Sequence, residues 1–266
     1  MTKTWRVFTG PPPELLHPHD AVVANGWWAT CVSVDQARGN ATEVGRAVLP
    51  PSLVGVAPSL VVTDVDSTLI NEEVIDQLAD LAGHRAEVEA ITSRAMNGQI
   101  DFHASLVERV ALLRGLPAES LSQVAASITL TPGARELVSW VHRVGGRFGI
   151  VSGGFTQVVT PIAQELRIDL VKAIDLEVDG GLLTGRVSGP VLDAEGKAAT
   201  LREWAGGDLG TTVAVGDGAN DIPMLKAAAL GIAFCAKPAV AASTGNRLDL
   251  RRLDAVAGLL GHDPSS

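Results

Sequence analysis

Three short runs with strand character, each followed at once by acidic or glycine-rich residues, constrain the fold of this chain most. They span residues 60–63, 147–151 and 212–215, and they end at Asp64, at Ser152-Gly153-Gly154 and at Gly216-Asp217-Gly218. Amphipathic stretches separate these runs, and a fourth run follows at 230–234. This alternation predicts a three-layer α/β fold in which helices cover both faces of a mainly parallel sheet. Because such sheets bind ligands beyond the carboxyl ends of their strands, we expect the chemistry at these three ends.

The segment between the first two runs, residues 64–146, is far longer than a single crossover helix needs. Glycine and proline punctuate it, which predicts helices at 72–82, 86–96, 102–114 and 118–128. We therefore expect a helical-bundle cap, inserted at about 71–130, in a core that spans 59–266. Further predicted elements are a helix at 134–144 and a surface β-hairpin formed by 171–178 and 182–187.

Residues 1–58 are expected to form a small α/β appendage ahead of the core. Residues 5–8 and 27–34 have strand character, and proline-containing segments follow each region. The segment His17-Pro18-His19-Asp20 holds metal-binding residue types, but a solvated loop is favoured because no partner ligands cluster with it. A regulatory or dimerising role for the appendage, and with it a homodimer, is left open.

Composition excludes several classes of function. The net charge of −9 and the scattered Lys and Arg residues argue against a nucleic-acid partner. No stretch approaches the ~20 apolar residues of a membrane helix, and the start lacks an apolar secretory signal. We therefore expect no membrane partner and a cytoplasmic location. Cys31 and Cys235 lie far apart without metal-binding spacing, which predicts two free thiols in the core.

The pentapeptide Asp64-Val65-Asp66-Ser67-Thr68 places two carboxylates two residues apart at the end of a predicted strand. A turn alone explains an isolated pair of this kind, since Asp often bends the chain after a strand. The segment Gly216-Asp217-Gly218-Ala219-Asn220-Asp221 after another strand favours chemistry instead. Carboxylates from two adjacent strand ends can hold Mg²⁺ and leave positions for water and a phosphate oxygen. Unequal surroundings would keep one carboxylate ionised on the cation and its neighbour protonated.

Four segments, DVDST, VSGGF, GKAATL and VGDGANDIPML, occur in an order that resembles the phosphoserine phosphatase branch of the haloacid dehalogenase superfamily. The resemblance covers the chain from about residue 60 to its end and implies a Rossmann-like core of the haloacid dehalogenase type. It implies that Asp64 is the nucleophile that forms an aspartyl-phosphate. Asp66 would protonate the leaving hydroxyl and then activate water, while Asp64, the backbone carbonyl of Asp66 and Asp217 would hold Mg²⁺.

The resemblance also assigns the groups around the phosphate. Lys197 would steady the nucleophile and the phosphoryl oxygens, whereas the rival cation, Lys172, has no motif around it. Small residues at the second strand end would let the backbone approach the phosphoryl group closely. The resemblance further implies that Ser152 and Gly153 donate hydrogen bonds to the phosphoryl group. Asn220 would reach the phosphate, and Asp221 would support the loop that carries Asn220.

The predicted cap offers residues for substrate selection. Phe102 and Arg109 are seven positions apart, so they share one face of a helix and present an apolar wall beside a cation. The resemblance implies that Arg109 binds a substrate carboxylate next to Phe102, and that Glu73 meets an ammonium group. Glu72 satisfies the preference for acidic residues in a first helical turn equally well, so only the family spacing selects Glu73. Met96 is expected in the core.

These patterns predict a Mg²⁺-dependent enzyme that hydrolyses O-phospho-L-serine to serine and phosphate, which the resemblance places at the end of serine biosynthesis. One alternative is a phosphotransferase that passes the phosphoryl group to another alcohol, or a phosphatase for another small phosphomonoester. A second alternative is a receiver-like signalling module. The large helical cap and Asp66 argue against the signalling module, because a switch should keep its phosphate rather than hydrolyse it.

Overall fold

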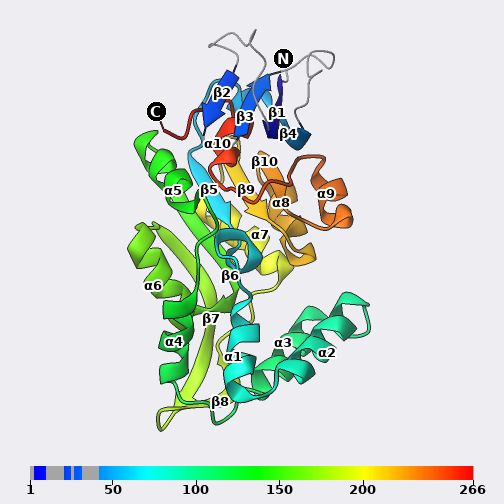
Figure 1. The fold of residues 1–266 in the computed structure, drawn as a ribbon, viewed down its shortest axis with the longest axis vertical. Helices are drawn as coiled ribbons and strands as arrows, with labels where there is room; N and C mark the ends of the chain where they lie inside the picture. Colours follow the sequence, from blue (N-terminus) through cyan, green and yellow to red (C-terminus); the bar gives the residue numbers. More distant parts are fainter. Residues whose placement is uncertain (1–2, 10–20, 25–26, 32–41, 266) are drawn as a thin grey trace.

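One large sheet organises the chain. The computed structural model describes residues 3–9, 21–24, 27–31 and 42–265. Its strands are β1 (Lys3–Thr9), β2 (Ala21–Ala24), β3 (Trp27–Cys31), β4 (Thr42–Leu49), β5 (Leu60–Thr63), β6 (Arg147–Phe155), β7 (Leu170–Asp179), β8 (Leu182–Ser188), β9 (Thr212–Gly216), β10 (Leu230–Phe234) and β11 (Arg247–Leu248). Within the described ranges, they form one sheet in the order β2-β3-β1-β4-β11-β10-β9-β5-β6-β7-β8 (Figure 1).

The centre of the sheet is parallel, from β11 through β7. Its covering helices are α5 (Ala134–Arg143), α6 (Thr156–Leu166), α7 (Ala194–Trp204), α8 (Ile222–Ala227), α9 (Pro238–Thr244) and α10 (Ala255–Leu259). Figure 1 shows α5 and α6 on one side of the sheet and α7 to α9 on the other. The predicted three-layer α/β fold is therefore confirmed. Because both faces are covered, β5, β9 and β10 are buried at every position, which explains their largely apolar sequences.

Strand β5 lies between β6 and β9, so the chain leaves it toward one edge of the sheet first and toward the other later. This reversal creates a topological switch point at the carboxyl ends of β5 and β9, the usual position of a ligand site in open α/β sheets. Asp64 and Asp217 follow these two ends. The fold alone therefore brings together two acidic motifs that are 153 residues apart in sequence.

Four helices between β5 and β6 form the cap: α1 (Val74–Ala82), α2 (Arg85–Met96), α3 (Phe102–Ala111) and α4 (Glu119–Ser127). Gly83 ends α1 in the left-handed conformation, with φ of 75°. Helix α3 begins where the Asp101 carboxylate accepts a hydrogen bond from the Ala104 amide. The expected start of α1 at Glu72 is wrong by two residues, because Glu73 is extended and serves as the N-cap.

The predicted surface hairpin is part of the central sheet. Its first strand, β7, pairs in parallel with β6, and β8 forms the edge. Near the hairpin tip, Leu183 exchanges hydrogen bonds with the cap: its carbonyl accepts from Gly115 and its amide donates to Leu116, both at 2.8 Å. The hairpin is therefore fixed to the base of the cap rather than free on the surface.

The described part of residues 1–58 differs from the expected α/β appendage. It forms four antiparallel strands, and β4 pairs with β11, so these strands continue the core sheet. A Cβ at Gly45 would lie 2.9 Å from Leu248 Cδ1, which shows how closely the two parts pack. The Trp27 indole donates to buried Asp254 at 3.3 Å, and this bond joins the strands to the C-terminal segment. The expected loop at 17–20 lies outside the described residues.

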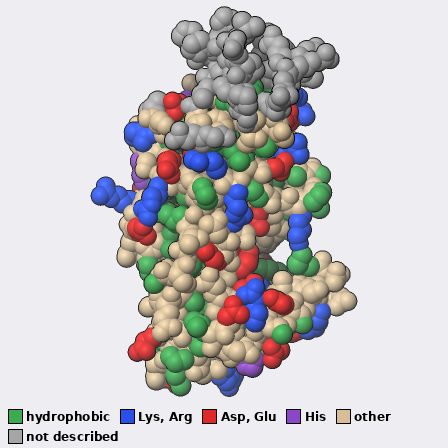
Figure 2. Space-filling view, viewed as in Figure 1, with side chains coloured by type: hydrophobic (Ala, Val, Ile, Leu, Met, Phe, Trp, Pro, Cys, Tyr) green, Lys and Arg blue, Asp and Glu red, His purple; other side chains and the backbone are tan. Residues whose placement is uncertain are grey.

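The structure also places the two cysteines and the charged side chains of the surface. The prediction of core thiols is wrong for Cys235, which is exposed, and Cys31 is only half-buried. Among the described residues, every helix is too short or too polar to cross a lipid bilayer. Basic and acidic side chains are interspersed on the face shown in Figure 2, where a notch separates the α2–α3 end of the cap from the core.

Candidate active site

Asp64 lies at the carboxyl end of β5 with only 6% of its surface exposed. Its Oδ1 accepts a hydrogen bond from the Val65 amide at 2.7 Å, and its Oδ2 lies 2.8 Å from Lys197 Nζ. Burial and the charge of Asp221 raise the pKa of Asp64, while Lys197 opposes this rise. The Asp64 carboxylate is therefore largely shielded from bulk water and paired with the Lys197 ammonium group.

Lys197 is the buried cation of the site. Its ammonium group lies 2.7 Å from Asp221 Oδ1 as well as 2.8 Å from Asp64, and its side chain is fully buried. Burial alone would lower the pKa of Lys197, but the two carboxylates outweigh it and raise that pKa. Asp193 begins the supporting helix α7 by accepting from the Gly196 amide at 2.8 Å. The rival Lys172 is exposed on β7, whereas Lys197 contacts Asp64 and Asp221.

Asp217 and Asp221 complete an acidic cluster with Asp64, and one oxygen from each lies within 4.8 Å of the others. Thr68 donates to Asp217 Oδ1 at 3.0 Å, and burial followed by the Asp221 charge raises the pKa of Asp217 to about 6. Gly216 is required here because a Cβ on it would lie 2.5 Å from Asp221 Oδ2. Three carboxylates against one lysine leave excess negative charge, which suits a hard divalent cation with oxygen ligands.

The metal set expected from the resemblance was Asp64, Asp66 and Asp217. The clustered carboxylates include Asp221 in place of the Asp66 side chain. This grouping concerns side-chain oxygens only, so it leaves the expected role of the Asp66 carbonyl open. Asp221 already bonds Lys197 through Oδ1 and the Gly218 amide through Oδ2, which fits the predicted supporting role.

Asp66 enters the same cleft from a tight turn, η2 (Val65–Leu69). Burial and the nearby charge of Glu73 raise the pKa of Asp66 to about 8. Gly154 leaves room for it, because a Cβ there would lie 3.0 Å from Asp66 Oδ2. With a pKa of about 8, Asp66 holds a proton at neutral pH that it can donate. Burial raises the pKa of both carboxyls, and the two differ in that Asp64 lies 2.8 Å from the Lys197 ammonium. Paired carboxylates in unequal surroundings suit acid–base work.

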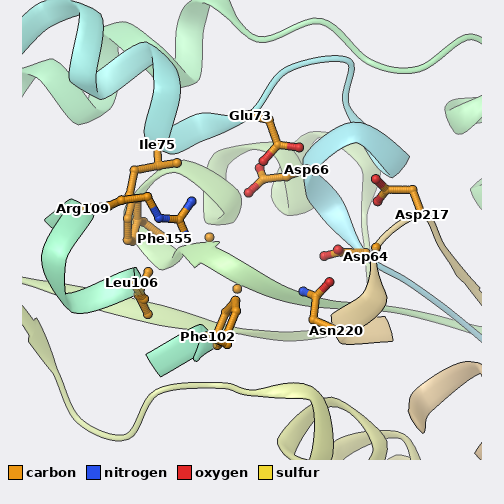
Figure 3. Close-up of a pocket in the computed structure, with 13 residues that line it drawn as sticks. Asp64, Asp66, Glu73, Ile75, Phe102, Leu106, Arg109, Phe155, Asp217 and Asn220 are labelled. Carbon is orange, nitrogen blue, oxygen red and sulfur yellow. The ribbon is translucent and has the colours of Figure 1, made fainter. Parts of the chain in front are cut away.

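The end of β6 lines another side of the cleft. Ser152 is fully buried and its hydroxyl accepts from the Gly154 amide at 2.8 Å. Gly153 lines the cleft, and a Cβ on it would meet the Phe102 ring at 3.2 Å. Asn220 reaches the cleft from η3 (Ala219–Asp221), beside Asp64 (Figure 3).

Cap residues line the opposite end of the cleft. Arg109 points from α3 toward Asp66 and Glu73, with Phe102 below it (Figure 3). Burial lowers the pKa of Arg109, while the nearby carboxylates oppose that change. Glu73 Oε1 accepts a 2.6 Å hydrogen bond from the Ser67 hydroxyl, and its partial burial raises its pKa. The cleft thus presents one cation and one anion to the far end of a ligand.

The cap also corrects two expectations. Glu72 is not in the first turn of α1, which begins at Val74, and it accepts hydrogen bonds from the Thr129 amide and hydroxyl. Met96 is not in the core: 62% of its surface is exposed, and Lys237 Nζ lies 3.7 Å from its sulfur.

Sequence reasoning missed some lining and supporting residues. Leu106 lines the cleft between Phe102 and Arg109, and the spacing of three and four residues along α3 could have identified it. Thr68 belongs to a quoted motif but had no assigned contact. Arg251, which donates to Asn71 Oδ1 at 2.9 Å, had no sequence signal at all.

Comparisons with known proteins agree with this geometry. Residues 61–226 match the family of haloacid dehalogenase-like hydrolases. The chain is 51% identical over 205 residues to phosphoserine phosphatase SerB2 of Mycobacterium tuberculosis, covering 76% of this chain and 50% of that protein. It is 50% identical over 200 residues to phosphoserine phosphatase of Lactococcus lactis subsp. lactis, covering 74% and 93%. It thus matches about half the length of the first and most of the second.

A solved structure with the same architecture is a phospho-aspartyl intermediate analogue of phosphoserine phosphatase. It superimposes with a TM-score of 0.71 at 42% identity, covering 75% of this chain and 97% of that one.

Proposed function

Because this chain belongs to the haloacid dehalogenase-like hydrolases, we propose that it is a Mg²⁺-dependent phosphatase for O-phospho-L-serine. One observation carries the proposal: a single cleft joins a lysine-bonded aspartate at one end to Arg109 and Glu73 at the other. The names of the relatives support the same substrate. The reaction would complete serine biosynthesis, and the expected cytoplasmic location and homodimer stay predictions.

In the first step, an Asp64 oxygen attacks phosphorus and forms an acyl-phosphate bond. The bond from phosphorus to the serine oxygen breaks, and Asp66 gives its proton to that leaving oxygen, so serine departs as a neutral alcohol. In the second step, Asp66 takes a proton from water, whose oxygen attacks phosphorus. The bond to Asp64 then breaks, which releases phosphate and restores both carboxyl groups. The pKa of about 8 for Asp66 supports its role as the first proton donor.

The acidic cluster fits a divalent cation. Asp64 and Asp217 would hold Mg²⁺ with the Asp66 carbonyl, and bound Mg²⁺ would neutralise charge between the nucleophile and the phosphate. Lys197 supplies the chain's own positive charge to Asp64, while Ser152, Gly153 and Asn220 would donate hydrogen bonds to phosphoryl oxygens.

Selection of the amino acid would occur at the cap end. Arg109 can bind the substrate carboxylate with two parallel N–H bonds, a geometry that suits guanidinium groups. Glu73 would accept from the ammonium group. Phe102 would close the cleft over Gly153 and exclude water from the phosphate region.

The test is a measurement of initial rates over amino-acid, sugar and nucleotide phosphates, with Mg²⁺ and with chelator. We expect O-phospho-L-serine to give the highest kcat/KM and chelator to abolish turnover. Rapid-quench labelling with radioactive phosphoserine should trap an acyl-phosphate on the wild type and none on Asp64→Asn, which should fold normally. Faster turnover of sugar or nucleotide phosphates would refute the substrate, and an active Asp64→Asn variant would refute the mechanism.

A further inference from the structure

Two chain segments connect the core to the cap, and they are joined to each other. Ile70 pairs with Leu130 in an antiparallel bridge, and the Asn71 amide donates to the Thr129 carbonyl at 3.0 Å. The Asn71 side chain adds bonds to the Thr129 hydroxyl at 2.9 Å and to the Leu130 carbonyl at 3.2 Å. With Glu72 also bonded to Thr129, the outgoing and returning segments form one hydrogen-bonded hinge.

Arg251 binds this hinge from the C-terminal part of the core. Its Nε donates to Asn71 Oδ1 at 2.9 Å, its Nη2 approaches the Asn71 carbonyl at 3.4 Å, and its Nη1 approaches the Ser67 carbonyl at 3.5 Å. The guanidinium therefore contacts Ser67, in the turn η2, and Asn71, in the segment that leads from η2 to α1. Its planar fork suits several acceptors at once.

The segment that carries Arg251 is itself anchored on both sides. Before it, the Asp249 amide donates to the Val44 carbonyl at 2.6 Å, and after it, the Leu253 amide donates to the Pro132 carbonyl at 2.8 Å. Arg251 therefore reaches the hinge from a fixed base, although its own side chain is at the surface.

Ser67 connects this contact to the cleft. It is not a glycine, yet its φ is 55°, in the left-handed region, which disfavours residues with a Cβ. In this conformation its amide donates to the Glu72 carbonyl at 3.2 Å, and its hydroxyl donates to Glu73 Oε1 at 2.6 Å. Arg251 thus holds the carbonyl of the residue whose side chain orients Glu73.

We propose that Arg251 is a positioning residue for amino-acid selection: it fixes Ser67 and the hinge so that Glu73 faces the substrate ammonium group. This inference rests on the proposed function, because it assigns Glu73 to the ammonium. Loss of Arg251 should weaken recognition of that group without removing any group that touches the phosphate.

The test compares O-phospho-L-serine with the phosphate ester of 3-hydroxypropanoate, which keeps the carboxylate and lacks the amino group. For Arg251→Ala we expect KM for phosphoserine to rise about 5- to 20-fold, with little change in kcat. The kcat/KM for the analogue should stay within about twofold, and Arg251→Lys should recover part of the loss. The matched control is Arg186→Ala, since Arg186 is an exposed arginine on β8 that pairs with Glu177, at 2.7 Å, and not with the hinge or with the segment that carries Arg251.

Outcomes separate this inference from the proposed function. A wild-type enzyme that does not prefer phosphoserine to the analogue would refute both. A wild type with that preference, combined with equal losses on both substrates or no loss in Arg251→Ala, would refute the inference alone. If Arg251→Ala has a much lower melting temperature, Asn71→Ala provides the second measurement, because it removes the side-chain acceptor of Arg251. Asn71→Ala should raise KM for phosphoserine and leave kcat/KM for the analogue within about twofold, and equal losses on both substrates would refute the inference.

Discussion

Replacing Lys197 with methionine should destabilise the protein strongly and in a pH-dependent way. The substitution keeps an unbranched side chain but removes a fully buried ammonium that lies 2.8 Å from Asp64 and 2.7 Å from Asp221. Loss of one member of a buried ion pair typically costs about 3–5 kcal/mol, because a charge is left without its partner. Here two carboxylates lose the same cation, so we expect a loss at the upper end of that range near pH 8.

The pH dependence follows from the protonation of the abandoned Asp64 carboxylate. Lys197 lowers the pKa of Asp64 against the effect of burial, so its removal raises that pKa further. The native variant then binds more protons than the unfolded chain, and its stability falls as pH rises. The free-energy loss should therefore be smaller at pH 5.5 than at pH 8, since protonation of Asp64 removes its unpaired charge.

Urea unfolding in EDTA at pH 5.5 and pH 8 measures this effect. Lys226→Met is the matched control, because Lys226 is exposed on α8 and its loss should change stability by less than about 0.5 kcal/mol. The double variant Lys197→Met/Asp221→Asn should be more stable than Lys197→Met, since one abandoned charge is gone. A loss below about 1 kcal/mol at both pH values, or a larger loss at pH 5.5, would refute the reasoning.

Three further predictions concern substrate and metal. Arg109→Ala should lower kcat/KM for phosphoserine about 10- to 100-fold but change an aryl phosphate little, because only the former has a carboxylate to bind; equal losses would exclude Arg109 from specificity. Mg²⁺ at 100 times its Kd should raise the free energy of unfolding by about 2.7 kcal/mol, measured by thermal unfolding. Asp217→Asn should remove this stabilisation by Mg²⁺, and an unchanged stabilisation would exclude Asp217 as a ligand. Mg²⁺ affinity should rise between pH 5 and 7, because Asp217, whose pKa is raised to about 6, must lose its proton to bind; calorimetry showing a flat affinity would contradict this.

The sequence was most informative where local pattern and burial coincide. The bounds predicted for β5 and β10 match the structure, because strands covered on both faces are largely apolar runs, and Asp64 marks the end of β5. The joining of β4 to β11 could not be predicted, since β11 has only two residues and its pairing depends on long-range contacts. Met96 was misplaced for a related reason: α2 buries only Val88, so an apolar residue at its end stays exposed.

In the candidate active site too, residues in local motifs could be predicted, and residues placed by long-range contacts could not. Asp64 and Lys197 lie in motifs with fixed neighbours, and the structure brings them into contact across 133 residues of sequence. Glu73 was chosen over Glu72 only by family spacing, and the structure gives a physical difference: Glu73 caps α1 facing the cleft, while Glu72 bonds Thr129. Arg251 could not be found from sequence, because an exposed arginine that bonds backbone carbonyls far along the chain has no periodicity or motif.

The pairing of β4 with β11 matters for anyone who wishes to trim this protein to its catalytic part. Cutting the chain before residue 59 would turn β11 into an open edge, remove the partner of the Asp249 amide, and leave Leu248 and Asp254 without their covering residues. Open edges recruit foreign strands, so such a fragment should self-associate in solution. The truncation would also weaken the anchoring of the segment that carries Arg251. A shortened enzyme would therefore be a poor substitute for the full chain in measurements of amino-acid selectivity.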